Sequence, residues 1–270
     1  MKRSTLRAAL DEGCPAIGMF AMMDGGASAR VLAHLGYDFL VFDLQHSAYD
    51  LTGIESVLAA CKGTDCTPIA RVHPRRPDQI EWVLDLGAHG VVVPMVNSAA
   101  DAQLAVDACR YPPRGRRSVA ALRNVLQRGS GYMHEANDDV LCIIQIEHIE
   151  AAERIDEILA VPGIDAVLPG HVDLALSMGH VLSYGGSVSN KVPAPVAQVI
   201  ERVERACAAR GIPVIPVAGT PDEFARAQQR GQRIACCNTD YHLFLNAASA
   251  QLAACRSAVQ AQQSGSLSTS

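Results

Sequence analysis

The sequence predicts an α/β protein of the (β/α)8 class, the TIM barrel. Eight short apolar runs rich in Val, Ile and Leu are bounded by turn residues, and longer segments of helical period lie between them. Short runs of this kind are typical of buried parallel strands, and their alternation with helices is typical of βαβ units. Eight such units match the closed barrel. The predicted strands are Ala16–Phe20, Phe39–Asp43, Pro68–Arg71, Gly90–Pro94, Leu141–Glu147, Ala166–Pro169, Pro213–Val217 and Arg233–Cys237.

Six segments between these strands carry apolar residues at helical spacing. Asp78–Leu86 begins at a residue that caps helices well and is followed by Gly87, a good residue just beyond a helix end. Gly211 and Gly231 follow two of the other helices in the same way. The remaining predicted helices are Ala27–Leu35, Ala99–Cys109, Glu150–Leu159, Ala197–Ala209 and Asp222–Arg230.

One connection interrupts this alternation, and the last residues differ in composition. Tyr111–Asp139 is a long segment with Pro112-Pro113 and several Gly and Arg residues, and loops of this length are usually functional or mobile. No shift in composition marks a second domain. We therefore expect residues 1–255 to form a single barrel domain and the polar residues 256–270 to form a disordered tail.

Composition excludes several classes of protein. No apolar run approaches about 18 residues, which excludes a membrane span. The formal net charge of −5 argues against a nucleic-acid partner. Asp11 and Glu12 interrupt the apolar stretch that a signal peptide requires. The nine cysteines form no C-x-x-C pair and are typical of reduced thiols, so we expect a cytoplasmic protein.

Polar residues gather where the predicted strands end. In a barrel these carboxyl ends share one face, which holds the active site. Each residue also has an ordinary interpretation: Asp173 and Asp240 as helix caps, Asp43 and His46 as structural hydrogen-bonding groups, and Arg71 as a packing ion pair. Glu147 is harder to explain in that way, because it follows the apolar run Leu141–Ile146, where an unpaired charge costs several kcal/mol. The groups at strand ends are Asp43, His46, Arg71, Gln145, Glu147, His171, Asp173 and Asp240.

These residue types suit the formation of an enolate. Glu147 and Asp173, from neighbouring strands, offer two oxygens to an octahedral divalent cation such as Mg²⁺ or Mn²⁺. Arg71 can neutralise a developing oxyanion. His46 can transfer a proton, with Asp43 orienting its ring. The backbone amides of Gly170, His171 and Val172, which precede a helix, can receive a substrate carboxylate.

Six strings of the sequence carry a resemblance to a known family. They are G-Y-D-F-L-V-F-D-L-Q-H-S (36–47), A-R-V (70–72), L-D-L-G-A-H-G-V-V-V-P-M-V (84–96), R-Y-P-P-R-G-R-R-S (110–118), I-Q-I-E (144–147) and L-P-G-H-V-D-L-A (168–175). In these strings the sequence resembles the metal-dependent, class II pyruvate aldolases, the 4-hydroxy-2-oxoheptanedioate and 2-dehydro-3-deoxyglucarate aldolase family. The Y-P-P-x-G-x-R and Q-I-E…D-L blocks, in that order, are specific to the family. The resemblance runs from about Gly18 to Gly179 and continues more weakly through Pro213–Asp240.

The resemblance implies a TIM barrel of the phosphoenolpyruvate/pyruvate-domain type. It also implies a homo-hexamer, a trimer of dimers in which the C-terminal helix is exchanged between subunits. The implied activity is reversible retro-aldol cleavage of a 4-hydroxy-2-oxo acid to pyruvate and an aldehyde through a metal-bound pyruvate enolate. The implied partners are thus a small 2-oxo acid and an aldehyde. The aldehyde pocket is expected to involve Tyr111–Asp139, the eighth strand and a neighbouring subunit.

The resemblance also assigns a role to each site residue. Glu147 and Asp173 would bind the divalent metal, Mg²⁺ or Mn²⁺, with Co²⁺ as a further possibility. Arg71 and Gln145 would contact the 2-oxo acid, and the amides of Gly170, His171, Val172 and Asp173 would meet its carboxylate. His46, supported by Asp43, would be the acid/base. Asp85 matches a position that reaches a neighbouring subunit's site.

The sequence departs from the family pattern at three places. Gln45 stands where the family has Glu, His171 and Ala175 replace Pro and Ser of the metal loop, and Cys237-Asn238-Thr239-Asp240 replaces G-V-D. These departures concern the aldehyde side more than the enolate side. Oxaloacetate decarboxylation and citrate-type condensation therefore remain alternatives. A binding protein without turnover is a further alternative, and the five groups Asp43, His46, Arg71, Glu147 and Asp173 argue against it.

Overall fold

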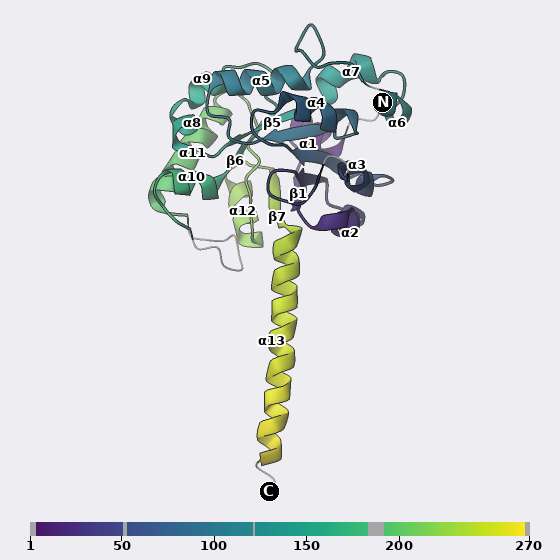
Figure 1. Cartoon of the computed structure of the whole chain (residues 1–270). Coiled ribbons are helices and arrows are strands. Elements are labelled where there is room, and N and C mark those ends of the chain that lie inside the picture. Colours follow the sequence, from purple (N-terminus) through teal and green to yellow (C-terminus); the bar gives the residue numbers. More distant parts are fainter. Residues whose placement is uncertain (1–3, 51–52, 121, 183–191, 268–270) are drawn as a thin grey trace.

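The computed structural model describes residues 4–50, 53–120, 122–182 and 192–267. A parallel sheet of seven strands, in the order β6-β5-β4-β3-β2-β1-β7, curls through the centre of the molecule with helices outside it (Figure 1). Its strands are buried on both faces, as their composition predicts. They are β1 (Ala16–Ala21), β2 (Phe39–Asp43), β3 (Thr67–Arg71), β4 (Gly90–Val93), β5 (Leu141–Ile146), β6 (Ala166–Pro169) and β7 (Ile234–Thr239).

The predicted strand Pro213–Val217 is not a regular strand. It forms one parallel bridge to each edge of the sheet, Val214 to Val167 of β6 and Val217 to Cys236 of β7. Pro213 and Pro216 have no N–H group, which limits the ladder that this segment can form. Their carbonyl oxygens still accept hydrogen bonds, from Val167 N and Cys236 N at 2.9 Å each. The segment therefore joins the two edge strands without being a continuous strand.

The predicted helices are present, two of them with the predicted limits. The predicted helix Glu150–Leu159 is divided at Arg154 into two helices, α8 and α9. The helices on the outside of the sheet are α2 (Ala27–Leu35), α3 (Ile54–Leu58), α4 (Pro77–Asp85), α5 (Ala99–Cys109), α8 (Ile149–Glu153), α9 (Ile155–Leu159), α10 (His171–Ser177), α11 (Ala194–Ala208) and α12 (Pro221–Gln229), with short 3₁₀ turns at Asp24–Gly26 and Ala59–Cys61.

Two buried clusters hold the sheet in place. The larger lies between the sheet and its outer helices, and the smaller lies inside the curl. Phe20, Phe39 and Ile143 belong to the inner cluster. Helix α1 (Thr5–Glu12), which the sequence did not predict, adds Leu6 to it and donates the Leu6 amide to Thr67 Oγ1 at the start of β3. It thus covers the end of the sheet where the strands begin, and the opposite end, here called the mouth, receives the carboxyl ends of the strands.

The segment Tyr111–Asp139 is not the long loop that its composition predicts. It contains α6 (Leu122–Arg128) and α7 (Tyr132–Asp139). The guanidinium of Arg117 is buried, donates to Asp85 at 2.7 Å and stacks on Tyr111 with 4.6 Å between its Cζ and the ring centroid. The segment connects the end of α5 to the start of β5, so it lies at the opposite end from the mouth of its own subunit. It therefore forms no wall of that mouth, in contrast to the sequence-based expectation.

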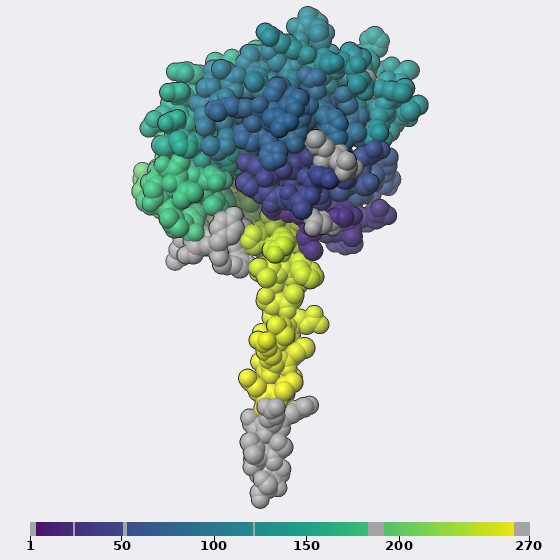
Figure 2. Space-filling model, in the orientation of Figure 1, coloured from purple at the N-terminus to yellow at the C-terminus, as the bar shows by residue number. Residues whose placement is uncertain are grey.

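The C-terminal helix α13 (Asp240–Leu267) projects from the body (Figures 1 and 2). It follows β7 directly and continues through residues 256–267, where the sequence predicts a polar tail; Ala and Gln, which favour helix, are frequent there. The division at residue 255 stays a prediction. Tyr241, Phe244, Leu252 and Val259 of α13 are each more than half exposed. No helix within the described ranges is both long and apolar enough to span a bilayer.

Candidate active site

An ion pair joins Asp43 and Arg71 at the mouth. Asp43 ends β2, Arg71 ends β3, and the two residues are register partners, so their side chains leave the sheet together. Arg71 Nε donates to Asp43 Oδ1 at 2.8 Å and Arg71 Nη2 donates to Asp43 Oδ2 at 2.5 Å. Asp43 is fully buried. This two-point contact fixes the plane of the guanidinium.

Asp43 does not orient the His46 ring as expected. Its Oδ1 also accepts the backbone amides of Gln45 at 3.0 Å and His46 at 3.3 Å. The carboxylate thus binds Arg71 and the turn after β2, and within the described ranges no hydrogen bond joins it to the imidazole. His46 is exposed at the mouth, where its ring is open to a substrate or to water.

Glu147 lies directly after β5, almost completely buried. Its Oε1 accepts the Met95 amide at 2.7 Å and its Oε2 accepts Gln145 Nε2 at 2.5 Å. Burial raises the pKa of Glu147 from 4.5 to about 7; the Met95 amide opposes this rise, the nearby Asp173 carboxylate adds to it, and the Arg71 charge opposes it. The mouth therefore brings Glu147, Asp173 and Arg71 together.

A close contact explains the glycine of the loop after β6. A Cβ at Gly170 would lie 2.6 Å from Glu147 Cβ and 2.7 Å from Glu147 Oε2. The Gly170 amide donates to Ile146 O at 2.9 Å, which holds the loop against β5. Asp173 lies in the first turn of α10 and is exposed. Gly170 thus permits the close approach to Glu147 of the segment that leads into Asp173.

His171 faces a different space. It lines a cavity of 530 Å³ between α11 and α12, together with Val217, Glu223 and Arg226. Burial lowers the pKa of His171, and the charges of Glu223 and Asp173 oppose this. The His171 side chain therefore lies beside the mouth, on the outer side of the metal loop predicted from the sequence.

The donor set at the mouth fits a divalent cation of the Mg²⁺ type. Glu147 and Asp173 supply two carboxylates, and the buried Gln145 Oε1 has no hydrogen-bond partner. Such a cation commonly takes one or two protein carboxylates and fills its remaining positions with water or substrate. No cluster of three or more His, Cys, Asp or Glu side chains disposed to hold a metal exists in the part of the chain that the structure describes. The two carboxylates therefore suit a cation whose remaining coordination positions are filled by substrate or water.

Asp85 is not at this mouth. It ends α4 at the opposite end of the sheet, where Arg117 binds it. Burial raises the pKa of Asp85 and the Arg117 charge opposes the rise. A contribution of Asp85 to catalysis therefore requires the mouth of another subunit.

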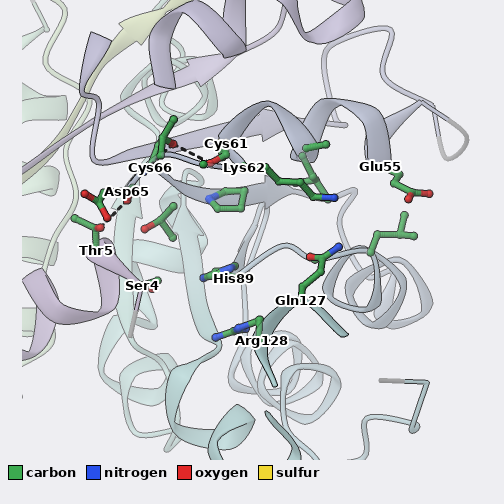
Figure 3. Close-up of a pocket in the computed structure, with 18 residues that line it drawn as sticks. Ser4, Thr5, Glu55, Cys61, Lys62, Asp65, Cys66, His89, Gln127 and Arg128 are labelled. Atoms are coloured by element: carbon green, nitrogen blue, oxygen red, sulfur yellow. Dashed lines mark hydrogen bonds between the residues drawn. The ribbon is translucent and has the colours of Figure 1, made fainter. Parts of the chain in front are cut away.

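A cavity of 680 Å³ also lies at that opposite end (Figure 3). Cys61 and Cys66 lie at one side of it and Arg128 at the other, with His89 between them. Burial, followed by the Arg128 charge, lowers the pKa of His89 to about 3, so its ring is neutral. None of the residues predicted for the active site lines this cavity.

Sequence reasoning missed two residues at the mouth. The Phe20 ring lies over the Arg71 guanidinium, with 4.9 Å between Arg71 Cζ and the ring centroid. Met95, at a positive φ of 53°, donates its amide to Glu147. Phe20 ends a predicted strand without a polar residue, and an aromatic at such an end is the signal that could have indicated it. The sequence near Met95 carries no such signal.

The family of the chain follows from comparison with known proteins. Residues 16–247 match the model of the HpcH/HpaI aldolase/citrate lyase family, and the chain belongs to this family. It is 34% identical over 240 residues to a 2-dehydro-3,6-dideoxy-6-sulfogluconate aldolase of Pseudomonas putida, covering 88% of this chain and 91% of that protein. It is 39% identical over 201 residues to a hydroxypyruvate/pyruvate aldolase of Rhizorhabdus wittichii, covering 74% and 80%.

Solved structures agree with this assignment. A family member from Burkholderia cenocepacia superimposes with a TM-score of 0.84 at 28% identity, over 94% of this chain and 99% of that one. The citrate synthase SbnG superimposes with the same score of 0.84 at 26% identity, over 94% and 98%.

Proposed function

We propose that the chain is a divalent-metal-dependent aldolase, a carbon–carbon lyase that cleaves a 4-hydroxy-2-oxo acid reversibly to pyruvate and an aldehyde. The observation that carries this proposal is the Arg71–Asp43 pair beside the Glu147 and Asp173 carboxylates at the mouth. A fixed guanidinium and a divalent-cation site side by side suit the developing negative charge of a pyruvate enolate. The relatives whose names contain aldolase support the same reaction class.

Glu147 and Asp173 would hold the metal, Mg²⁺ or Mn²⁺, with Co²⁺ also compatible with oxygen donors. When bound, the ion supplies positive charge next to the substrate oxygens. Arg71 binds the 2-oxo acid with the part of its guanidinium that Asp43 leaves free. As the resemblance implies, Gln145 would contact the same acid; its Nε2 donates one N–H to Glu147 Oε2 and has a second N–H for an oxygen of the acid.

The substrate carboxylate would meet the backbone amides of Gly170, His171, Val172 and Asp173, which precede and open α10. His46 is the proposed acid/base: it removes the proton from the C4 hydroxyl, and the C3–C4 bond then breaks. The electron pair of that bond becomes the enolate, and the aldehyde leaves. The exposure of His46 at the mouth supports this role, because the proton must be exchanged with substrate or water.

We further propose a closed (β/α)8 barrel of the phosphoenolpyruvate/pyruvate-domain type. The hydrogen bonds of segment 213–218 to both β6 and β7 support closure. The proposed assembly is a homo-hexamer, a trimer of dimers in which α13 is exchanged. The exposed apolar side chains of this projecting helix support a partner that covers it. In such an assembly Asp85 is available to a neighbouring mouth. Free cysteines favour a cytoplasmic location.

The test is proton exchange at the methyl group of pyruvate. Purified protein with Mg²⁺ or Mn²⁺ in deuterated water is expected to exchange the methyl protons, and chelation or Arg71→Ala is expected to abolish exchange. Exchange that survives Arg71→Ala would contradict the assignment of Arg71. A double variant, Glu147→Ala with Asp173→Ala, is expected to lose stoichiometric metal.

A second candidate reaction keeps the enolate but changes its partner. The similarity to the citrate synthase SbnG favours a citrate-type condensation, and oxaloacetate decarboxylation uses the same enolate. Pyruvate with a short hydroxyaldehyde separates these reactions: an aldolase forms an aldol product. A protein that releases CO₂ from oxaloacetate and forms no aldol product would be a decarboxylase.

A further inference from the structure

The guanidinium of Arg71 is held on two sides. Asp43 binds one edge through Nε at 2.8 Å and Nη2 at 2.5 Å. The Phe20 ring covers one face, with 4.9 Å from Cζ to the ring centroid. Nη1 makes no hydrogen bond within the described ranges, so it is the donor left for a ligand.

Phe20 is placed for this contact by the sheet. It is the penultimate residue of β1, it is almost completely buried, and it belongs to the cluster inside the curl. β2, which carries Asp43, lies between β1 and β3. The ring therefore reaches across β2 to Arg71 from inside the sheet. A buried aromatic in this position restricts a long side chain that otherwise has many rotamers.

We infer that Phe20 is a positioning residue for Arg71: its ring and the Asp43 carboxylate together fix the guanidinium so that Nη1 points to the 2-oxo acid. This inference rests on the proposed function for the identity of the ligand. An arginine fixed before the ligand arrives loses less conformational freedom on binding, and its affinity for a planar anion is higher. Phe20 acts through Arg71 and needs no contact with the ligand.

Oxalate, a planar dianion that resembles pyruvate enolate, is the probe, and its Kd is measured by calorimetry on the Mg²⁺-loaded protein. Phe20→Leu keeps an apolar side chain but removes the aromatic face, and it is expected to weaken oxalate binding roughly 3- to 30-fold. Phe20→Tyr keeps the face and is expected to restore binding. In pyruvate exchange, Phe20→Leu is expected to raise KM more than it lowers kcat.

Two controls separate positioning from general loss of structure. Phe39→Leu is the same change in the same inner cluster. Phe39 is the first residue of β2, at the opposite end of the strand from Asp43 and Arg71, so this variant is expected to leave oxalate affinity unchanged. In an Arg71→Lys background, Phe20→Leu is expected to have little further effect, because the planar guanidinium is gone. An equal loss from Phe39→Leu, or an undiminished effect of Phe20→Leu with Arg71→Lys, would overturn the inference.

A second readout is independent of the reaction. The Nε–H resonance of Arg71 in protein with isotope-labelled arginine reports the mobility of the guanidinium without any ligand. Phe20→Leu is expected to increase that mobility, and Phe20→Tyr is expected to restore the wild-type signal. An unchanged signal in Phe20→Leu overturns the positioning role even in an active enzyme. If the wild type does not exchange the protons of pyruvate, the proposed function is contradicted. The positioning role of Phe20 is then tested by the Nε–H resonance of Arg71 alone.

Discussion

At the scale of single residues, Glu147 has an electrostatic cost that depends on pH. Its pKa is about 7 in the folded protein against an ordinary 4.5, because burial disfavours the charged form. The folded state therefore keeps a proton that the unfolded state loses. The contribution of Glu147 to the free energy of unfolding is therefore fully present below about pH 4.5 and is lost as the pH rises through about 7.

The first prediction concerns the metal-free protein. Glu147→Gln removes this titration, so at pH 8 the variant is expected to be more stable than the wild type, by up to about 3 kcal/mol. The measurement is urea unfolding from pH 4 to 8 in the presence of a chelator. Glu150→Gln, in the first turn of α8, is the control for the same substitution outside the mouth and is expected to keep the fall in stability that Glu147 causes. Parallel profiles for the wild type and Glu147→Gln would contradict the pKa assignment.

The second prediction concerns the buried ion pair. Asp43→Ala leaves the mostly buried Arg71 without its partner and is expected to destabilise the fold by about 3 kcal/mol, measured by chemical denaturation. The Asp78 carboxylate binds Arg76 with a similar geometry but on the surface. Asp78→Ala is therefore the matched control, and no measurable change is expected from it. Similar losses from both variants would show that burial of the pair contributes little.

At the scale of elements, the loop between β6 and α10 depends on the absence of a side chain at Gly170. The third prediction is that Gly170→Ala forces the loop away from Glu147, since the new Cβ would lie 2.6 Å from Glu147 Cβ. Affinity for Mg²⁺, measured by calorimetry, is expected to fall at least about 10-fold, as it does when groups that orient ligands are lost. Gly131→Ala is the control, because its nearest neighbour is the mobile end of Glu135. Wild-type affinity in Gly170→Ala would remove this loop from the metal site.

The elements differ in how well the sequence predicts them. Strands such as β2 and β5 are read directly from apolar runs, because both of their faces are buried. The segment Pro213–Val217 has the same composition, but its prolines interrupt the pairing. Helices α6 and α7 were missed because they are short and polar. Contacts from distant residues hold them, including that of Asn124 Nδ2 with Leu84 O at 2.9 Å.

The candidate site, too, can be predicted from the sequence only in part. That Asp43 and Arg71 lie at the mouth follows from the ends of predicted strands, but their pairing follows from strand register, which composition does not reveal. Proximity in sequence suggested His46 as the partner of Asp43. The structure instead pairs Asp43 with a residue 28 positions away.

At the scale of the whole molecule, α13 projects from the body with exposed apolar side chains along its length. The fourth prediction is that truncation after Asn246 abolishes the proposed hexamer, because the apolar residues Leu252 and Val259 are removed with the helix. Sedimentation or light scattering gives the mass of the assembly. Truncation after Gln262 is the control and is expected to preserve it. A truncated protein that still forms the full assembly would contradict the exchange of α13.

The joint at the base of α13 has a consequence for access to the site. Asp240 begins the helix and accepts hydrogen bonds from the Met22 amide at 2.8 Å and the Met23 amide at 3.2 Å, just beyond the end of β1, and from Ser28 Oγ in the first turn of α2 at 2.7 Å. These bonds anchor the helix at the rim of the mouth, and it extends outward from there (Figure 1). A neighbouring subunit that covers α13 would therefore lie beside the entrance to the mouth. In the proposed assembly, the route by which small molecules enter and leave would therefore be bordered by that neighbour as well as by the chain's own loops.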